Sequence, residues 1–290
     1  MRYSIYMKFP TSLQFLLVGI VLLAVTGGIT YLIGNNLLQD ASAIPNEPLP
    51  YQTADGADCN IAVIPLTGQI FASQANADAQ THIDGSANTS GEAVVTALER
   101  AKNDSSIKGV ALRVDSPGGS PTGGEMIANA LKALGKPSAA WITDSGDSAA
   151  YLASTGATTI IASSFSDVAD IGVTGSYLDQ SGSNTQNGSK FQQISAGTYK
   201  DVGNPNAPLT PAGKAYLQKN VDDDYQTLIH EIATNRHLSL DAVKALADGS
   251  SMTGAMAMGT GLIDALGGQA ETQKWFAQKL PRDTVPVLCD

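Results

Sequence analysis

The chain has 290 residues, of which 43% are apolar and 15% are charged. This composition is typical of a folded protein with a sizeable core and excludes a disordered or coiled-coil chain. The formal net charge of -10, with no local cluster of Lys and Arg, argues against nucleic-acid binding. Two cysteines are too few for a structural zinc site, and we expect no metal and no cofactor.

An uncharged, largely apolar run near the N-terminus extends from Phe15 to Ile33 and is interrupted only by Thr26 and Thr30. Its length predicts a transmembrane anchor over residues 13–34. A cleaved secretory signal is the alternative, but the run is longer than the usual apolar region of such a signal, and no Ala-x-Ala site follows directly.

The charges that flank this run predict its orientation. Arg2 and Lys8 precede it, whereas the first charge after it is Asp40. The positive-inside rule therefore predicts a cytoplasmic N-terminus over residues 1–12, and a chain that continues on the extracytoplasmic side of the inner membrane. A Pro- and Ala-rich linker is expected over residues 35–58, followed by one domain over 59–290. On the extracytoplasmic side, Cys59 and Cys289 could form a disulfide or remain two thiols.

Short apolar runs alternate with segments of helical periodicity in the predicted domain. The apolar runs predict strands covered on both faces, at residues 61–66, 110–114, 139–142 and 159–162. Helices are predicted over 94–101, 127–134, 239–247 and 270–279, with a long one that begins at Thr210-Pro211. Two polar stretches, 71–90 and 179–189, predict surface loops. The alternation predicts a parallel α/β core.

Two turns follow two of these strands. Residues 115–119 read Asp-Ser-Pro-Gly-Gly, and residues 144–150 read Asp-Ser-Gly-Asp-Ser-Ala-Ala. Because the carboxyl ends of parallel strands share one edge of a sheet, the turns are expected to converge there. The backbone N–H groups of Gly119 and Ala149 could then form an oxyanion hole beside Ser148. Taken alone, a Pro-Gly-Gly turn and a serine at a helix start are usually structural.

The three histidines give little support to a Ser-His-Asp site. His230 and His237 fall on or at the end of the long predicted helix, and His82 lies in a polar stretch. We expect surface or structural roles for all three.

Several motifs, in order, resemble the signal peptide peptidase A family of serine peptidases. They are Arg-Val-Asp-Ser-Pro-Gly-Gly-Ser at 113–120, Ser-Ala-Ala-Tyr at 148–151, Tyr-Lys-Asp at 199–201, and the segments 252–254 and 261–268. The resemblance implies the crotonase-like fold shared with Clp protease, a repeated β-β-α superhelix with C-terminal helices. It also implies Ser148 as nucleophile and Lys200, 52 residues later, as general base. Lys190 is a competing base, but its polar surroundings predict a solvent-facing loop.

The resemblance also implies a substrate class and an assembly. The expected substrates are hydrophobic peptides, such as cleaved signal peptides or membrane-protein fragments. Small members of the family resemble rings in which the Ser and Lys of one site come from neighbouring subunits, so we expect a homo-oligomer.

Two departures from the family pattern keep alternatives open. Asp147 stands before the nucleophile where small residues are usual, and a carboxylate close to Lys200 would favour the ammonium form that cannot act as a base. Residues 169–173 read Ala-Asp-Ile-Gly-Val instead of Gly-Ser-Ile-Gly-Val. The alternatives are a catalytically degenerate membrane scaffold and a crotonase-type acyl-CoA enzyme. The outward topology and the lack of a suitable Glu pair argue against the second.

Overall fold

The computed structural model describes residues 58–79 and 88–289. The predicted cytoplasmic segment, the transmembrane anchor and all but the last residue of the linker lie outside these residues, as does His82. None of the helices in the described ranges has the length and apolar character needed to cross a membrane.

A mainly parallel sheet forms the centre of the domain. Its strands lie in the order β10-β1-β4-β5-β6-β9, and every neighbouring pair is parallel. The bounds are β1 Ile61–Thr67, β4 Gly109–Ser116, β5 Ser138–Asp147, β6 Thr159–Ala162, β9 Ala265–Leu266 and β10 Leu288–Cys289. All four predicted strands are present, which confirms the parallel α/β core. The apolar runs form these strands because both faces of the sheet are covered.

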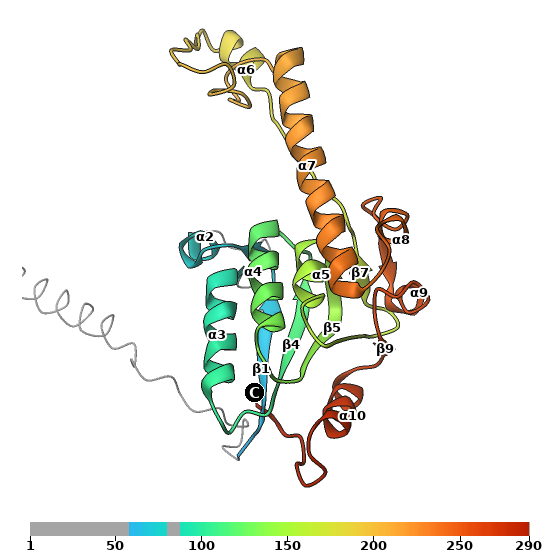
Figure 1. Cartoon of the computed structure of the whole chain (residues 1–290). Coiled ribbons are helices and arrows are strands. Elements are labelled where there is room, and N and C mark those ends of the chain that lie inside the picture. The colour runs from blue at the N-terminus through green and yellow to red at the C-terminus, as the bar shows by residue number, and fades with distance from the viewer. Residues whose placement is uncertain (1–57, 80–87, 290) are drawn as a thin grey trace, which may run out of the picture. The chain divides into compact units, whose positions relative to one another are not determined.

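Helices cover the two faces of the sheet. On one face lie α3 (Gly91–Asn103), α4 (Pro121–Lys132) and α5 (Ala149–Ser154), side by side in Figure 1. On the other face, Phe276 of α10 (Gln269–Lys279) is fully buried against Ile61, Ala111 and Ala139. The residues next to Ile61 and Ala111 in the strands, Ala62 and Leu112, face the layer of α3, α4 and α5, because successive side chains of a strand point to opposite faces.

A small branch of the sheet extends the carboxyl end of β5. Strand β7 (Asp167–Ala169) pairs with residues 145–147 of β5 and, in antiparallel fashion, with β8 (Ser251–Thr253). A separate two-stranded sheet joins β2 (Ile70–Phe71) to β3 (Thr89–Ser90). The remaining short helices are α2 Gln74–Ala79, α6 Ser181–Gln186, α8 Leu240–Lys244 and α9 Gly254–Ala257.

The long predicted helix is α7 (Pro211–Arg236), and Thr210 caps it by accepting a hydrogen bond from the Gly213 N–H. Most of its buried residues lie toward the C-terminal end, at 228–233. Its N-terminal half projects beyond the sheet and carries residues 175–210 (Figure 1). We call residues 175–220 the arm. The loop prediction for 179–189 missed α6, which buries no residue and therefore leaves no apolar periodicity in the sequence.

Cys59 and Cys289 form a disulfide, with an S–S distance of 2.06 Å. The bond joins the segment just before β1 to the last residue of β10. It therefore ties the two ends of the described domain to one edge of the sheet. Of the two states left open by the sequence, the paired one is observed.

Candidate active site

Ser148 occupies a strained turn between the carboxyl end of β5 and the start of α5. Its backbone angles, φ 51° and ψ -120°, are rare for a residue with a side chain. The Ser148 N–H donates to the Ala169 carbonyl at 2.7 Å, and the Ser148 carbonyl accepts from the Leu152 N–H at 3.0 Å. Its hydroxyl makes no capping bond to α5. Ser148 is thus not an ordinary helix cap, and the strain at this turn resembles that of a nucleophile elbow.

The turn at residues 115–119, Asp-Ser-Pro-Gly-Gly, packs directly against Ser148. Gly118 has φ 97°, a conformation that side chains disfavour. A Cβ atom there would lie 2.8 Å from the Ser148 Cβ and 3.0 Å from the Ala149 nitrogen. Only glycine leaves this space open, so the prediction that the two turns converge is correct.

Strand β2 holds the second glycine of that turn. The Ile70 N–H donates to the Gly118 carbonyl and the Ser120 N–H donates to the Ile70 carbonyl, both at 2.8 Å. These bonds lie on either side of Gly119 and leave its own N–H unused. Within the described ranges, neither this N–H nor that of Ala149 donates a hydrogen bond to the protein. Two free donors therefore flank the turn that carries Ser148.

Ser148 lines an open cavity of about 350 Å³. The other lining residues are Asp170, Gly172, Val173, Thr174, Tyr225, Ala247, Asp248 and Gly249. Burial raises the pKa of Asp170, whereas hydrogen bonds from the Ser250 hydroxyl and N–H lower the pKa of Asp248. In the part of the chain that the structure describes, no Lys, Arg or His lines this cavity.

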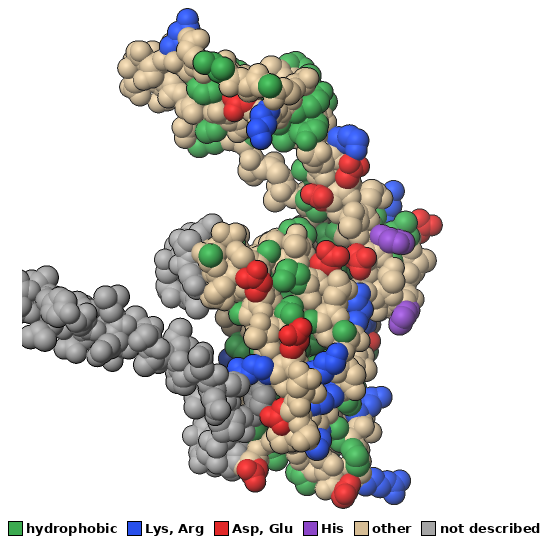
Figure 2. Space-filling model, turned by 60° about the vertical axis from the view of Figure 1, so that its left-hand side comes forward, with side chains coloured by type: hydrophobic (Ala, Val, Ile, Leu, Met, Phe, Trp, Pro, Cys, Tyr) green, Lys and Arg blue, Asp and Glu red, His purple; other side chains and the backbone are tan. Residues whose placement is uncertain are grey.

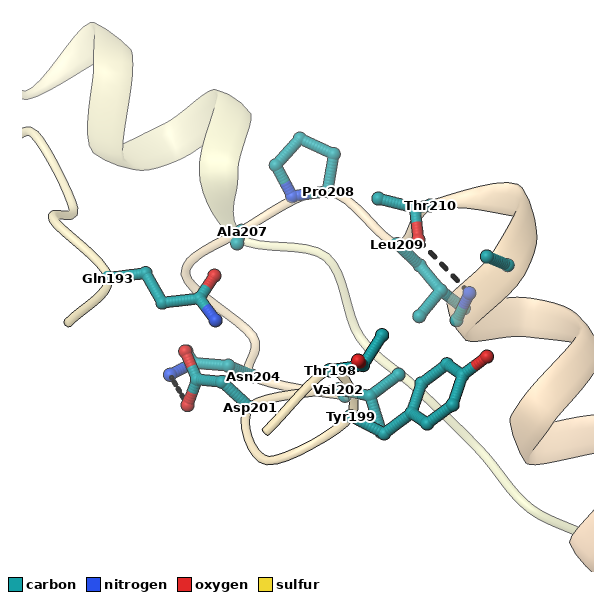
Figure 3. Close-up of a pocket in the computed structure, with 13 residues that line it drawn as sticks. Gln193, Thr198, Tyr199, Asp201, Val202, Asn204, Ala207, Pro208, Leu209 and Thr210 are labelled. Carbon is teal, nitrogen blue, oxygen red and sulfur yellow. Dashed lines mark hydrogen bonds between the residues drawn. The ribbon is translucent and has the colours of Figure 1, made fainter. Parts of the chain in front are cut away.

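Lys200 lies elsewhere, exposed in a turn of the arm. The residues on either side of it, Tyr199 and Asp201, line a second cavity of about 140 Å³, in which Asp201 accepts a hydrogen bond from Asn204 (Figure 3). The Tyr199 ring stacks on Tyr216 of α7, with a centroid separation of 4.3 Å.

The axis of α7 gives the separation between the turn that carries Lys200 and the Ser148 cavity. Tyr216 packs beside the lysine turn, and Tyr225, nine residues further along α7, lines the Ser148 cavity. At a rise of about 1.5 Å per residue, nine residues separate the two by about 13 Å. In the described part of the chain, Lys200 is therefore not among the residues that line the Ser148 cavity.

The other basic candidates do not line the Ser148 cavity either. Lys190 is exposed on the same arm, and His230 and His237 are exposed on α7 and at its C-terminal cap. Sequence reasoning had not singled out Tyr225 or Asp248 as site residues. The Asp-Gly pair at 248–249 was the one available turn signal, and it gives no information about the strand end that the turn approaches.

A strained serine at a strand-to-helix turn, with free backbone donors beside it, is the arrangement of serine hydrolases that form an acyl-enzyme. A family model, peptidase family S49, matches residues 130–281. The chain therefore belongs to peptidase family S49, the family of signal peptide peptidase A, and its class is serine peptidase. The matched residues include Ser148 and Lys200, whereas the Gly118-Gly119 turn precedes them.

Individual relatives agree with this assignment. A protein of Methanocaldococcus jannaschii named as a protease is 34% identical over 63% of this chain and 60% of its own length. A similarly named protein of Synechocystis is 31% identical over 69% of this chain and 72% of its own length. A protein of Enterococcus faecium named as a signal peptide peptidase is 30% identical over 60% of this chain and 51% of its own length. The chain thus spans about half to three quarters of the length of each of these three relatives.

Proposed function

We propose that this chain is a membrane-anchored serine endopeptidase in which Ser148 is the nucleophile and Lys200 the general base. The observation that carries the proposal is the geometry of Ser148: a strained backbone, a hydroxyl free of capping bonds, and unused N–H donors beside it. Strain of this kind persists only where the surrounding structure enforces it, and it concentrates at active sites.

The chemistry follows from these groups. A neutral Lys200 amine accepts the proton of the Ser148 hydroxyl as the oxygen attacks the substrate carbonyl. The N–H groups of Gly119 and Ala149 stabilise the oxyanion that forms, and the amine then protonates the leaving nitrogen. A water activated by the same amine hydrolyses the acyl-enzyme. This scheme requires that Lys200 be shielded from water, because an exposed ammonium cannot act as a base.

A second copy of the chain supplies that shielding in our proposal. The arm carries Lys200 away from the Ser148 cavity of its own subunit and exposes apolar side chains, among them Leu178 at 70% and Ile194 at 98% (Figure 2). Apolar side chains grouped on an extended segment are typical of interfaces between subunits. The arm would then deliver Lys200 to the cavity of a neighbour in a homo-oligomer. We further propose the crotonase/Clp-type superhelix for each subunit, because membership of the family and the parallel core both fit it.

The location and the substrates complete the proposal. The apolar segment 13–34 anchors the chain with its N-terminus in the cytoplasm and the peptidase domain outside. The disulfide supports this topology, because such bonds persist in oxidising compartments. The substrates are hydrophobic peptides, such as cleaved signal peptides or membrane-protein fragments, in line with the name of the Enterococcus relative.

A serine-directed fluorophosphonate probe tests the proposal. The intact protein is expected to acquire one label per chain, located at Ser148 by peptide mass spectrometry, and Ser148→Ala to acquire none. Lys200→Ala is expected to label at least a hundredfold more slowly, and Lys190→Ala, changed on the same arm, at the normal rate. A catalytically degenerate scaffold would leave Ser148 unlabelled, which would refute the enzyme.

A further inference from the structure

Asp147 is a buried acid next to the candidate nucleophile. It is the last residue of β5, and only 9% of it is exposed. One carboxyl oxygen, Oδ1, is buried and has no hydrogen-bond partner among the described residues. A carboxylate in this position would leave a charged oxygen without water and without a donor, which is strongly unfavourable.

The second carboxyl oxygen of Asp147 makes a short contact with a hydroxyl group that has only one hydrogen to donate. Asp147 Oδ2 lies 2.5 Å from the Ser145 hydroxyl oxygen, which itself lies 3.1 Å from the Ser116 carbonyl oxygen. The Ser145 hydroxyl has one hydrogen to donate. An ionised Asp147 and the Ser116 carbonyl can only accept, so one of the two contacts would then have no hydrogen between its oxygens. If Asp147 carries its own proton, it donates to Ser145, and Ser145 donates to Ser116. Both contacts are then satisfied.

The charges around Asp147 act in the same direction. Asp167 on β7 and Asp170 just after it are the charged groups that face the carboxyl, and both are acids. On its own strand the partner is the neutral Ser145, and from β4 it is the Ser116 carbonyl that Ser145 contacts. Burial has the largest effect and raises the pKa of Asp147; a hydrogen bond from the Ser145 hydroxyl lowers it, by less than burial raises it, and the charges of Asp170 and Asp167 raise it again.

The contact chain reaches both turns of the active site. Ser116 ends β4, and its hydroxyl accepts a hydrogen bond from the Gly118 N–H at 3.1 Å and donates one to the Gly68 carbonyl at 2.6 Å. Asp147 ends β5 and is bonded covalently to Ser148. A hydrogen-bonded link from Asp147 to Ser116 therefore connects the strand ends that carry the two free N–H donors.

We propose that Asp147 is a positioning residue held as the neutral acid, whose proton completes the link Asp147–Ser145–Ser116 and sets the spacing of the Gly119 and Ala149 donors. The part that concerns catalysis rests on the proposed function. A neutral Asp147 also removes the objection raised by the sequence, since it carries no charge to hold an approaching lysine in its ammonium form.

Infrared spectroscopy tests the protonation state without reference to activity. The difference spectrum between the intact protein and Asp147→Asn, at about pH 5, is expected to contain the C=O stretch of a protonated carboxyl, although an ordinary Asp with a pKa of about 3.9 is ionised there. Asp144→Asn is the matched control, because Asp144 is an exposed acid on the same strand, and it is expected to change only carboxylate bands. Carboxylate bands alone for Asp147 would overturn the proposal.

The pH dependence of stability provides a second readout. A folded-state pKa above the unfolded value gives a contribution that is complete below the unfolded pKa and is lost as the pH rises through the folded pKa. The free energy of unfolding of the intact protein, relative to Asp147→Asn, is therefore expected to fall as the pH rises above about 4, the unfolded value. A difference that is constant or rises with pH would contradict the neutral acid.

Steady-state kinetics test the positioning role. Asp147→Ala is expected to lower kcat more than tenfold with KM little changed, because the spacing of the donors matters most in the transition state. Asp147→Asn keeps a neutral donor to Ser145 and is expected to recover most of that kcat. An Asn variant as impaired as the Ala variant would refute the hydrogen-bonded link. If Ser148 fails to label but the carboxyl is protonated, the proposed function is wrong and the neutral acid stands.

Discussion

Gly118→Ala tests whether the close approach of the two turns is needed for catalysis. The added Cβ would meet the Asp147 carbonyl oxygen and the Ser148 Cβ at 2.8 Å, and the Ala149 nitrogen at 3.0 Å. All three atoms belong to the turn of the nucleophile, so it must move, and the Ala149 donor must move with it. Loss of one oxyanion donor costs about 10²–10³ in kcat, or about 2.7–4 kcal/mol.

The variant also loses stability, and this loss must be separated from the effect on chemistry. Alanine at φ 97° costs about 1–3 kcal/mol from strain at such a position. Gly135→Ala is the matched control, since Gly135 also has positive φ, 72°, but a Cβ there meets nothing within 4 Å. It is expected to lose about 1–2 kcal/mol of stability with kcat unchanged.

The assay is kcat for a fluorogenic peptide, measured at a temperature where thermal unfolding shows both variants to be fully folded. We expect a fall of two to three orders of magnitude for Gly118→Ala and less than twofold for Gly135→Ala. A kcat for Gly118→Ala within threefold of the control would refute the reasoning, because the donors would then tolerate displacement of the turn.

Three further predictions concern stability. Replacing Cys59 and Cys289 by Ser opens a loop of 230 residues and is expected to cost about 5 kcal/mol, a fall of roughly 10–20 °C in Tm; a shift of only a few degrees would contradict it. Arg236→Ala removes an ion pair with Asp264, 2.7 Å, and is expected to cost about 2–4 kcal/mol in denaturant unfolding, with no loss if the pair is incidental. Phe276→Ala empties a fully buried site and is expected to cost about 3–5 kcal/mol in the same assay, whereas a cost below 1 kcal/mol would mean that α10 is not part of the core.

The central strands were predictable because burial on both faces requires continuous apolar runs, and such runs are visible at 61–66, 110–114, 139–142 and 159–162. The short helices α2 and α6 were not. They bury little, so local hydrogen bonds maintain them, as where Thr185 donates to the Ser181 carbonyl in α6. Such bonds leave no apolar pattern in the sequence.

The site was predictable in part. The two strand-end turns indicated that Gly119, Ser148 and Ala149 would lie close together, because parallel strands end at one edge. The catalytic role assigned to Ser148 rested on the family resemblance. The spacing that suggested Lys200 carries no information about which subunit it serves. The motif at 169–173 includes Asp170, but it does not show that the residue lines the cavity, which follows from the pairing of β7 with β5. Tyr225 reaches the cavity from α7, and no local motif marks it.

The protonation state of Asp147, the acid before Ser148, likewise depends on neighbours that are distant in the sequence. Sequence reasoning treated Asp147 as a charge that opposes a lysine base, because an aspartate is ionised in water at neutral pH. Its burial beside Ser145, with two further acids facing it, reverses that expectation. Burial of an individual polar side chain at a strand end depends on its neighbours in space, so the protonation state could not be derived from the residue type.

A mixing experiment tests the central claim most directly: that Ser148 of one subunit works with Lys200 of another. Ser148→Ala and Lys200→Ala are each inactive in our account, but co-assembled at equal amounts after dissociation they combine an intact serine with an intact lysine at roughly a quarter of the sites of a ring. We expect peptidase activity to return to about that fraction of the unmixed wild-type level, and the double variant mixed with either single variant to remain inactive. Mixed assemblies, verified by mass spectrometry, that stay inactive would contradict the shared site.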